Sequence, residues 1–179
     1  MRLGALWCAC ALVMFGRLTD AAGDSTTPGE SAPLFFVSKS ENKNQVSYAV
    51  RLDAECRPTG AAPVFAYWRM LERSPVVVEP LLALEEMAYG VGPQHATPSG
   101  ESGGSVVLAL RSLPDRTIVV RTRRQGQTCV AEATTRIADL PARLFRVHAR
   151  LAWPFGVAAL EIAGWAESDG HVVRETIRP

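Results

Sequence analysis

The chain has 179 residues, of which 47% are hydrophobic, and its formal net charge at pH 7 is +1. A charge this small excludes the basic composition of a general nucleic-acid-binding protein. The hydrophobic fraction and the length are those of a globular protein with one core rather than of a disordered chain.

The N-terminus has the pattern of a secretory signal peptide over residues 1–22. Arg2 precedes an unbroken apolar run over residues 3–15, and the small residues Ala21 and Ala22 follow it. The run is shorter than the about twenty apolar residues that a membrane-spanning helix needs. We therefore predict export, to the periplasm or the extracellular space, and no transmembrane span in the mature chain.

The segment that follows the predicted signal peptide, residues 23–33, is rich in Ser, Thr, Pro, Gly and Glu and has no apolar pattern. We predict a disordered lead-in there. Residues 34–179 are then about the commonest size for one domain, and we predict a single β-rich domain over them. Cleavage would remove Arg2, Arg17 and Asp20 and leave equal numbers of basic and acidic residues.

Two of the four cysteines, Cys8 and Cys10, lie inside the predicted signal peptide. Cys56 and Cys129 would be the two left in an exported product, and oxidising compartments favour disulfides. We predict one structural disulfide, Cys56–Cys129, with two free thiols as the alternative. In the chain-entropy model, closing so long a loop stabilises the fold by about 4 kcal/mol.

The hydrophobic pattern along the rest of the chain is mostly that of β-strands, with period-two alternation or short β-branched runs. The predicted strands are 46–52, 63–71, 105–110, 117–123, 128–137, 142–151, 157–166 and 171–177. The clearest turns are at Gly126 and at Ser168-Asp169-Gly170, and a single short helix is predicted over residues 80–87. Eight or nine such strands predict an all-β fold, a single antiparallel β-sandwich with one short helix. A closed antiparallel β-barrel is the alternative.

Charge is distributed unevenly along the sequence. Residues 111–150 contain nine arginines, and residues 72–101 contain five glutamates. Under one hypothesis the arginines form a patch that faces acidic glycans or phospholipid headgroups. Under the other, the two segments neutralise each other as neighbouring strands or face solvent.

The sequence contains no convincing catalytic or metal-binding motif. Gly100-Glu101-Ser102-Gly103-Gly104 matches the G-x-S-x-G string of serine hydrolases, but that motif needs a strand before it and a helix after it. Here a loop precedes and a predicted strand follows, so we interpret the match as chance. The histidines His95, His148 and His171 are dispersed singly, and no metal or other cofactor is predicted.

Several segments together resemble a known family. They are Phe35-Phe36-x-x-Lys39-Ser40-x-Asn42-x-Asn44-x-Val46-x-Tyr48, Tyr67-Trp68, Leu84-Glu85-x-x-Ala88-Tyr89-Gly90-Val91, Glu161-Ile162-x-Gly164 and Glu175-x-Ile177-x-Pro179. In these segments the chain resembles an uncharacterised family of exported bacterial proteins, the domain of unknown function numbered 4833. The resemblance covers residues 34–179, implies bacterial export, and carries no known activity or site residue.

Two groups of residues within those segments are candidates for binding. Lys39, Ser40, Asn42 and Asn44 carry hydrogen-bonding groups that would converge on a polar ligand such as a sugar, because loops at the ends of a sandwich commonly bind ligands. Alternatively the asparagines only shape a loop.

The second group is Glu85 and Tyr89, beside the predicted helix. A buried glutamate there would be a general acid or base if its pKa were raised. Under the alternative interpretation the glutamate pairs with an arginine while Tyr89 packs.

We predict a non-enzymatic binding or accessory domain of the bacterial cell envelope, with an envelope protein or a glycan as the candidate partner. One alternative is a barrel that binds a small apolar ligand in a cavity lined by Phe65, Trp68, Val107 and Leu151.

The other alternative is a glycan hydrolase. It would pair Glu85 or Glu86 with Asp53 or Glu161, and it needs the two carboxyl groups about 5 to 10 Å apart in one cleft.

Overall fold

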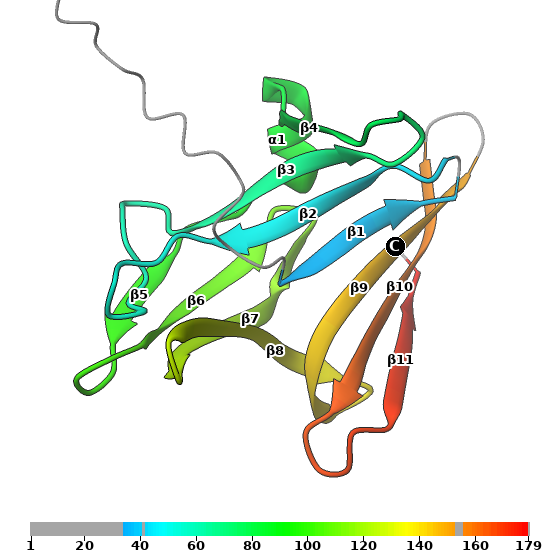
Figure 1. Ribbon diagram of the computed structural model, residues 1–179. Coiled ribbons are helices and arrows are strands. Elements are labelled where there is room, and N and C mark those ends of the chain that lie inside the picture. The colour runs from blue at the N-terminus through cyan, green and yellow to red at the C-terminus, as the bar shows by residue number, and fades with distance from the viewer. Residues whose placement is uncertain (1–33, 41, 153–155, 179) are drawn as a thin grey trace, which may run out of the picture.

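The computed structural model describes residues 34–40, 42–152 and 156–178, and these form one helix and an eleven-stranded mixed sheet (Figure 1). The strands are β1 (Phe35–Lys39), β2 (Gln45–Val50), β3 (Val64–Met70), β4 (Val77–Pro80), β5 (His95–Pro98), β6 (Gly104–Leu110), β7 (Leu113–Gln125), β8 (Thr128–Ile137), β9 (Leu140–Ala152), β10 (Gly156–Ala166) and β11 (Val172–Ile177), and the helix is α1 (Ala83–Tyr89). The predicted signal peptide and lead-in lie outside the described residues. Within the described part, no helix is long and apolar enough to cross a bilayer.

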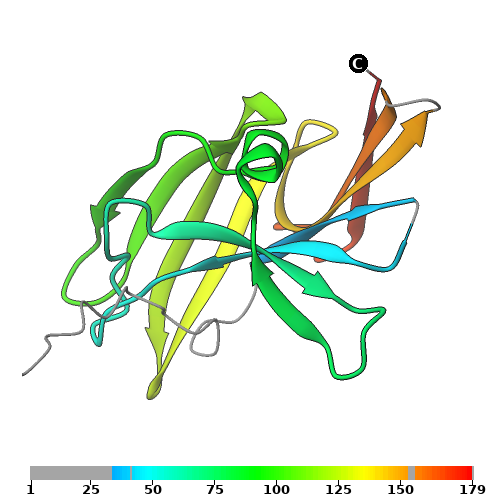
Figure 2. The ribbon, with the colours of Figure 1, turned by 90° about the horizontal axis from the view of Figure 1, so that it is seen from above.

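The sheet divides at β9 into two layers. One edge of β9 pairs with β8 where Thr134 lies opposite Arg143, and then with β1, in parallel, where Phe36 lies opposite Arg146. The other edge of β9 pairs with β10, which in turn pairs with β11. Strands β1–β4 therefore form a first layer, β5–β8 a second layer, and β9–β11 a stem that joins them. Seen from above, the strands of the second layer cross those of the first (Figure 2).

The all-β, sandwich-like fold class is confirmed, and the closed-barrel alternative is wrong because the path of paired strands runs from β4 to β5 without closing. The parallel β1–β9 pair makes the sheet mixed rather than purely antiparallel. Each predicted strand corresponds to an observed one. Strands β1, β4 and β5 were not predicted. The helix begins at Ala83 because Pro80 is still paired with Tyr67 in the sheet.

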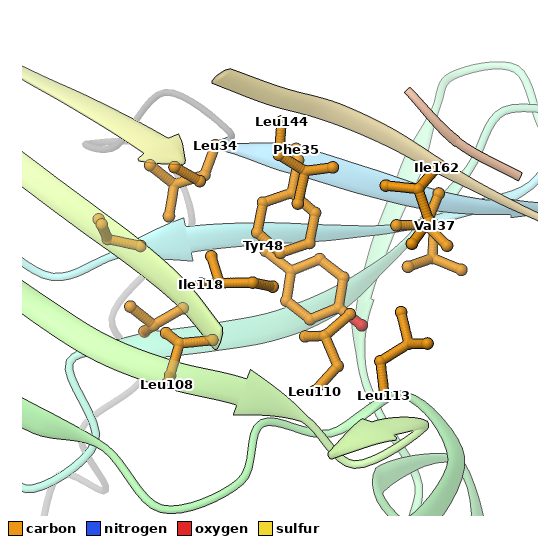
Figure 3. Close-up of a cluster of buried hydrophobic side chains, with 14 of the residues drawn as sticks. Leu34, Phe35, Val37, Tyr48, Leu108, Leu110, Leu113, Ile118, Leu144 and Ile162 are labelled. Carbon is orange, nitrogen blue, oxygen red and sulfur yellow. The ribbon is translucent and has the colours of Figure 1, made fainter. Parts of the chain in front are cut away.

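The hydrophobic core lies between the two layers and against the stem (Figure 3). Alternation turns Phe35 and Tyr48 inward, where their rings stack with centroids 4.4 Å apart. Leu108 and Ile118 reach the same cluster from the second layer. The buried Tyr48 hydroxyl donates a hydrogen bond of 2.6 Å to the carbonyl of Tyr89, and burial raises the pKa of Tyr48 far above its ordinary value.

The residues predicted to line an apolar ligand cavity do not face a common interior. Trp68 is buried in the core, whereas Val107 is 39% exposed. Phe65 is only partly buried, and the guanidinium of Arg51 lies over its ring at 4.3 Å. Neighbouring residues of a strand point to opposite faces, so Phe65 and Trp68, three positions apart, cannot both line an interior. The predicted cavity is wrong.

The predicted disulfide Cys56–Cys129 is confirmed. It joins the loop between β2 and β3 to the start of β8, across 73 positions of the sequence. Cys56 is buried, and its carbonyl accepts a hydrogen bond of 2.7 Å from the Thr122 hydroxyl. The bond therefore fixes the start of β8 to the opposite layer.

Candidate functional site

A groove opens where β1 and β8 diverge from β9, and we call it the β1–β8 groove. Its volume is about 520 Å³, and it is lined by Leu34, Phe35, Phe36, Gln45, Ser47, Arg69, Val130, Ala131, Glu132, Arg143, Leu144, Phe145 and Trp165. Figure 1 labels the strands β1, β8 and β9 that border it. The groove thus results from the exchange of strand partners along β9.

Two aromatic rings and an arginine form one wall of the β1–β8 groove. The ring centroids of Phe145 and Trp165 are 4.3 Å apart, and the Arg143 guanidinium lies 4.6 Å from the Trp165 ring. Arg143 Nη1 is also 3.0 Å from Glu132 Oε1. Trp165 remains 37% exposed, which is unusual for a residue that contributes so much apolar area when buried.

A β-bulge places Phe145 in this wall. Ala163 pairs with Arg146, but the next residue, Gly164, pairs with Leu144, so Phe145 has no partner in β10. An unpaired bulge residue can turn its side chain away from the regular alternation. A Cβ at Gly164 would lie 2.7 Å from the carbonyl oxygen of Arg143. Only glycine allows β9 and β10 to approach this closely beside the bulge.

The opposite wall comes from the outer face of the first layer. Phe36 lies opposite Ser47, and Gln45 lies opposite Arg69, so these four side chains share one face. The Arg69 guanidinium forms no hydrogen bond or ion pair with any residue that the structure describes. Among the described residues, this wall therefore offers a positive charge without an ion-pair partner, on the same face as the Phe36 ring.

The groove also exposes an unpaired strand edge. β8 pairs with β7 from Thr128 to Thr134, but its pairing with β9 begins only at Thr134. Thr128 and Gln125 flank a two-residue turn, so they form a hydrogen-bonded pair. Along the antiparallel strands, hydrogen-bonded and non-hydrogen-bonded pairs then alternate. By this alternation the backbone groups of Cys129 and Ala131 point away from β7. Ala131 lines the groove, and its amide and carbonyl have no strand partner there within the described residues.

A second hollow of about 290 Å³ continues from the groove toward the β10–β11 turn. It shares Glu132, Arg143 and Trp165 with the groove and adds Glu167 and Asp169. Glu167 forms an ion pair of 3.5 Å with Arg121. The carboxylates at this end therefore have arginine or histidine partners, because Asp169 pairs with His171.

The residues predicted to bind a ligand make separate contacts with different parts of the fold, and none of them lines the β1–β8 groove. They are Lys39, Ser40, Asn42, Asn44, Glu85 and Tyr89. The Lys39 ammonium lies 5.4 Å from the Trp68 ring, and Tyr89 packs edge-on against that ring with centroids 5.8 Å apart. Glu85 accepts a hydrogen bond of 2.8 Å from the Leu82 amide at the start of α1. The binding role of these residues stays a prediction.

The side chains of the asparagine loop and of Ser40 accept hydrogen bonds from backbone amides. Asn42 Oδ1 accepts a hydrogen bond of 3.0 Å from the Asn44 amide, which is the geometry expected of a loop-forming asparagine. Asn44 Oδ1 accepts one from the Glu72 amide at 3.3 Å, and Ser40 Oγ accepts one from the Leu151 amide at 3.3 Å. These side chains hold the ends of strands together.

The carboxylates proposed for a glycan hydrolase have structural partners on different elements. Glu161 Oε1 is 2.6 Å from Arg146 Nη2 on the neighbouring strand. Asp53 accepts hydrogen bonds from the amides of Glu55 and Arg57 in its own loop. Both views show α1, which carries Glu85, beside the first layer and away from β10 (Figures 1 and 2).

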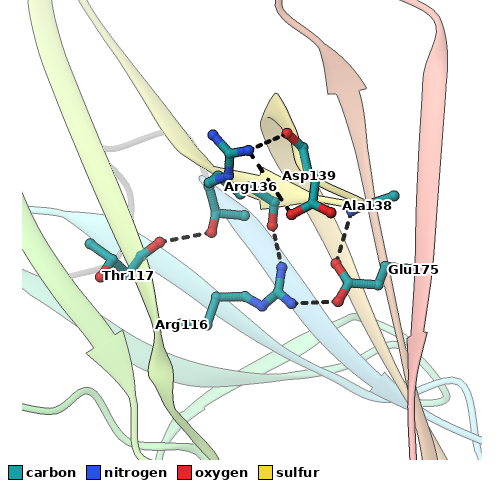
Figure 4. A network of polar contacts seen from close by, with 7 residues as sticks. Arg116, Thr117, Arg136, Ala138, Asp139 and Glu175 are labelled. Carbon is teal, nitrogen blue, oxygen red and sulfur yellow. Dashed lines mark hydrogen bonds and ion pairs between the residues drawn. The ribbon is translucent and has the colours of Figure 1, made fainter.

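Among the described residues, five of the nine arginines of residues 111–150 form ion pairs, with carboxylates of β8, β10 and β11 or of the turns that follow β8 and β10. Arg116 Nη2 is 2.7 Å from Glu175 Oε1, and Glu175 Oε2 accepts a hydrogen bond of 3.0 Å from the Ala138 amide (Figure 4). Arg116 also donates to the carbonyl of Arg136. We call Arg116, Glu175 and their backbone partners the β11 clamp. None of the ion pairs among the described residues joins these arginines to the glutamates of residues 72–101, so the hypothesis that the two segments neutralise each other is not supported.

The remaining motifs keep their predicted context. The G-x-S-x-G string spans the turn between β5 and the first residue of β6, and a strand follows it instead of a helix. His148 Nδ1 lies 2.9 Å from Ser38 Oγ, and His171 contacts Asp169. Over the described residues there is no cluster of three or more His, Cys, Asp or Glu side chains that would hold a metal.

No motif of the sequence points to Phe145, Trp165, Arg143 or Arg69 as binding residues. A local signal did exist in Gly164, because a glycine inside a strand often marks a bulge or a close backbone approach. Trp165, the residue after it, is three positions from the buried Ile162 and so lies on the opposite, exposed face of β10. No local pattern shows that Arg69, more than seventy positions away, faces the same groove.

The fold and the groove define the class of protein as an all-β, sandwich-like protein with a partly apolar, arginine-bearing surface groove. Residues 35–176 match the family model described as Domain of unknown function (DUF4833). The match covers most of the chain, and the chain belongs to this family. No curated protein and no solved structure matches it.

Proposed function

We propose that this protein is an exported, non-enzymatic binding domain of the bacterial cell envelope and that the β1–β8 groove is its ligand site. The observation that carries the proposal is the exposed wall of Phe145 and Trp165 with Arg143 over the indole. Aromatic and arginine side chains are the types most enriched where binding energy is concentrated. Exposed apolar surface of this kind marks interaction sites in soluble proteins.

The chemistry of the groove favours a ligand with both an apolar part and a negative charge. The rings offer an apolar wall, and Arg69 on the opposite side has no ion-pair partner among the described residues. A few polar groups in an otherwise apolar concavity fix the orientation of a ligand. Gln45 and Ser47 beside Arg69 supply such groups.

Two further features support export. The N-terminal sequence has the signal-peptide pattern, and the Cys56–Cys129 disulfide is of the kind that persists in oxidising compartments. If export is correct, the full chain expressed in a bacterial host is recovered from the periplasm without residues 1–22 and with its disulfide formed. Intact mass before and after reduction measures both. Retention of the N-terminal segment in a cytoplasmic product would contradict this part of the proposal.

The ligand site is tested with envelope material from the same host. The periplasmic protein is immobilised, and binding of solubilised envelope fractions is compared between wild type, Trp165→Ala, Arg143→Ala and the control Arg123→Ala. Arg123 is exposed on β7 and does not line the groove. We expect binding to fall at least tenfold in the first two variants, since alanine at a hot spot removes about 2 kcal/mol or more. Equal binding by all four proteins would overturn the assignment of the groove.

A further inference from the structure

We infer that the occupant of the β1–β8 groove is an extended, acidic polypeptide segment that adds a strand to the free edge of β8. This inference rests on the binding role proposed above and names its ligand class. Three observations in the described residues carry it: an unpaired strand edge, an unpaired arginine, and an indole whose ring is already in contact with other groups.

The first observation is the edge of β8. Over residues 128–133 this strand has β7 on one side only, and the groups of Ala131 that point away from β7 face the groove. Backbone amides and carbonyls are strong hydrogen-bonding groups, and an open edge is a template for another strand. Strand addition satisfies such an edge with alternating backbone bonds from an extended peptide. A sugar has no comparable alternation of donors and acceptors.

The edge is also held in place before any ligand arrives. The Cys56–Cys129 disulfide anchors β8 two residues from Ala131, and Arg124, just before the turn into β8, donates to the carbonyl of Ala54. Holding a binding element in its bound conformation reduces the entropy lost on association. The first half of β8 therefore needs no rearrangement to accept a strand.

The second observation is charge. Across the groove from Ala131, Arg69 has no ion pair or hydrogen bond with the described residues, whereas Arg143 is paired with Glu132 and Arg121 with Glu167. The unbalanced charge of the groove is thus positive and lies at Arg69. A guanidinium binds a carboxylate through strong, charge-assisted hydrogen bonds. The peptide is therefore expected to carry an aspartate, a glutamate or its own C-terminal carboxylate at this point.

The third observation distinguishes a peptide from a glycan. Sugars bind aromatic platforms by lying over a free ring face, but the Trp165 ring has the Arg143 guanidinium over it at 4.6 Å and the Phe145 ring against it at 4.3 Å. Packed in this way, the indole and Phe145 form a wall rather than a platform. A wall of this kind fits the alternate side chains of a neighbouring strand.

The test uses the periplasmic protein against two probe sets, a displayed library of linear peptides and an array of acidic oligosaccharides. The first variant is Ala131→Pro, which removes the amide that points into the groove and leaves the β7–β8 bonds of residues 130 and 132 in place. The second is Arg69→Glu, which inverts the charge, with the matched control Arg123→Glu on the exposed face of β7. Thermal unfolding of each variant verifies that it folds.

We expect wild type and Arg123→Glu to retain acidic linear peptides. Ala131→Pro should weaken that binding about fivefold, the effect of one backbone hydrogen bond. Arg69→Glu should weaken it by tenfold or more and shift the retained set toward basic peptides. If Ala131→Pro does not fold, the charge swap alone decides. Selected peptides re-synthesised with an amidated C-terminus distinguish a terminal carboxylate from a side chain.

Two results would overturn the inference, and they differ in what they say of the groove. Retention of oligosaccharides only, unchanged by Ala131→Pro and lost in Arg69→Glu and Trp165→Ala, would replace the peptide with a glycan and leave the proposed binding role standing. Retention of neither probe set, or retention unaffected by every groove variant, would overturn both the strand addition and the role of the groove.

Discussion

The two halves of β8 are held in the fold by different means. Residues 134–137 pair with β9, and on the other edge Thr134 pairs with β7 while the Thr135 hydroxyl donates to the Thr117 carbonyl. They end in the tight turn of Ala138 and Asp139, both at positive φ. The β11 clamp stands beside that turn and uses both oxygens of Glu175. Residues 128–133 have one paired edge and are tied to the opposite layer by the Cys56–Cys129 disulfide.

This difference shows how a sheet can keep an edge open. Along residues 134–137, β9 on one edge and side-chain hydrogen bonds from Thr135 and Arg116 on the other satisfy polar groups within the protein, as in buried networks generally. Along residues 128–133, whose only strand partner among the described residues is β7, the Cys56–Cys129 disulfide holds the strand, and the polar groups on its other edge remain available. Saturated contacts in this molecule stabilise structure, and the unsaturated ones are the candidates for binding.

The largest effect is expected from removing the disulfide. Replacing both Cys56 and Cys129 by serine should lower the free energy of unfolding by about 4 kcal/mol, because the bond closes a loop of 73 positions. Urea denaturation measures the change. Since the bond holds the first half of β8, binding in the groove should weaken as well. A stable double variant with unchanged binding would show that β7 alone positions this edge.

The second half of β8 is tested at the β11 clamp. Glu175→Gln should lower the free energy of unfolding by about 2 kcal/mol, the scale of a charge-assisted hydrogen bond between partly buried groups, since the side chains of Arg116 and Glu175 are 18% and 28% exposed. Groove binding should not change. The matched control is Glu167→Gln, whose ion pair with Arg121 is exposed and is expected to contribute less than about 0.5 kcal/mol. A similar loss in both variants would remove the distinction between clamp and surface pair.

The clamp also predicts how stability depends on pH. Burial alone would raise the pKa of Glu175, but the hydrogen bonds from Arg116 and from the Ala138 amide, with the Arg116 charge, outweigh it and hold that pKa below the ordinary value of 4.5. Because the folded pKa is the lower one, protonation favours the unfolded chain. The contribution of Glu175 is present above pH 4.5 and is lost as the pH falls through the folded pKa.

Unfolding measured between neutral and acidic pH checks this dependence. In wild type, protonation of Glu175 should lower the free energy of unfolding as the pH falls. This part of the decline should be no larger than the loss caused by Glu175→Gln at neutral pH. In Glu175→Gln that part of the decline should be absent. Parallel curves for the two proteins would contradict the assigned pKa.

The sequence predicted the elements whose pattern is local. Eight strands have enough alternating residues to show the period of two, and Gly126, at φ +62, forms the predicted hairpin turn. Strands β4 and β5 have four residues each, too few to show alternation. β1 was missed because Phe35, Phe36 and Val37 are consecutive apolar residues without alternation, in a strand that pairs both with β2 and, in parallel, with the distant β9. The Cys56–Cys129 pair was predictable because signal-peptide cleavage would leave only those two cysteines.

The groove could not be predicted in the same way. It exists because β9 changes partners between Arg143 and Arg146, and because a bulge at Phe145 turns that ring toward Trp165. Register and bulges depend on how distant strands meet. The sequence therefore placed its candidates in a loop, at Asn42, and in the short helix, at Glu85, whereas the groups left open among the described residues lie on strands.

The smallest effect on stability is expected in the groove itself. Arg143→Ala removes the ion pair with Glu132, whose side chains are 46% and 36% exposed, and the contact with Trp165. At exposed sites an ion pair or a cation–π contact each contributes about 0.5 kcal/mol, so we expect the free energy of unfolding to fall by about 1 kcal/mol at most. Binding in the groove should fall far more than stability does. Urea denaturation measures the loss of stability. If the free energy of unfolding falls as much as in Glu175→Gln, then Arg143 is a structural contact like the β11 clamp. The distinction between the two halves of β8 would then fail at Arg143, which lies opposite Thr134, where the two halves meet.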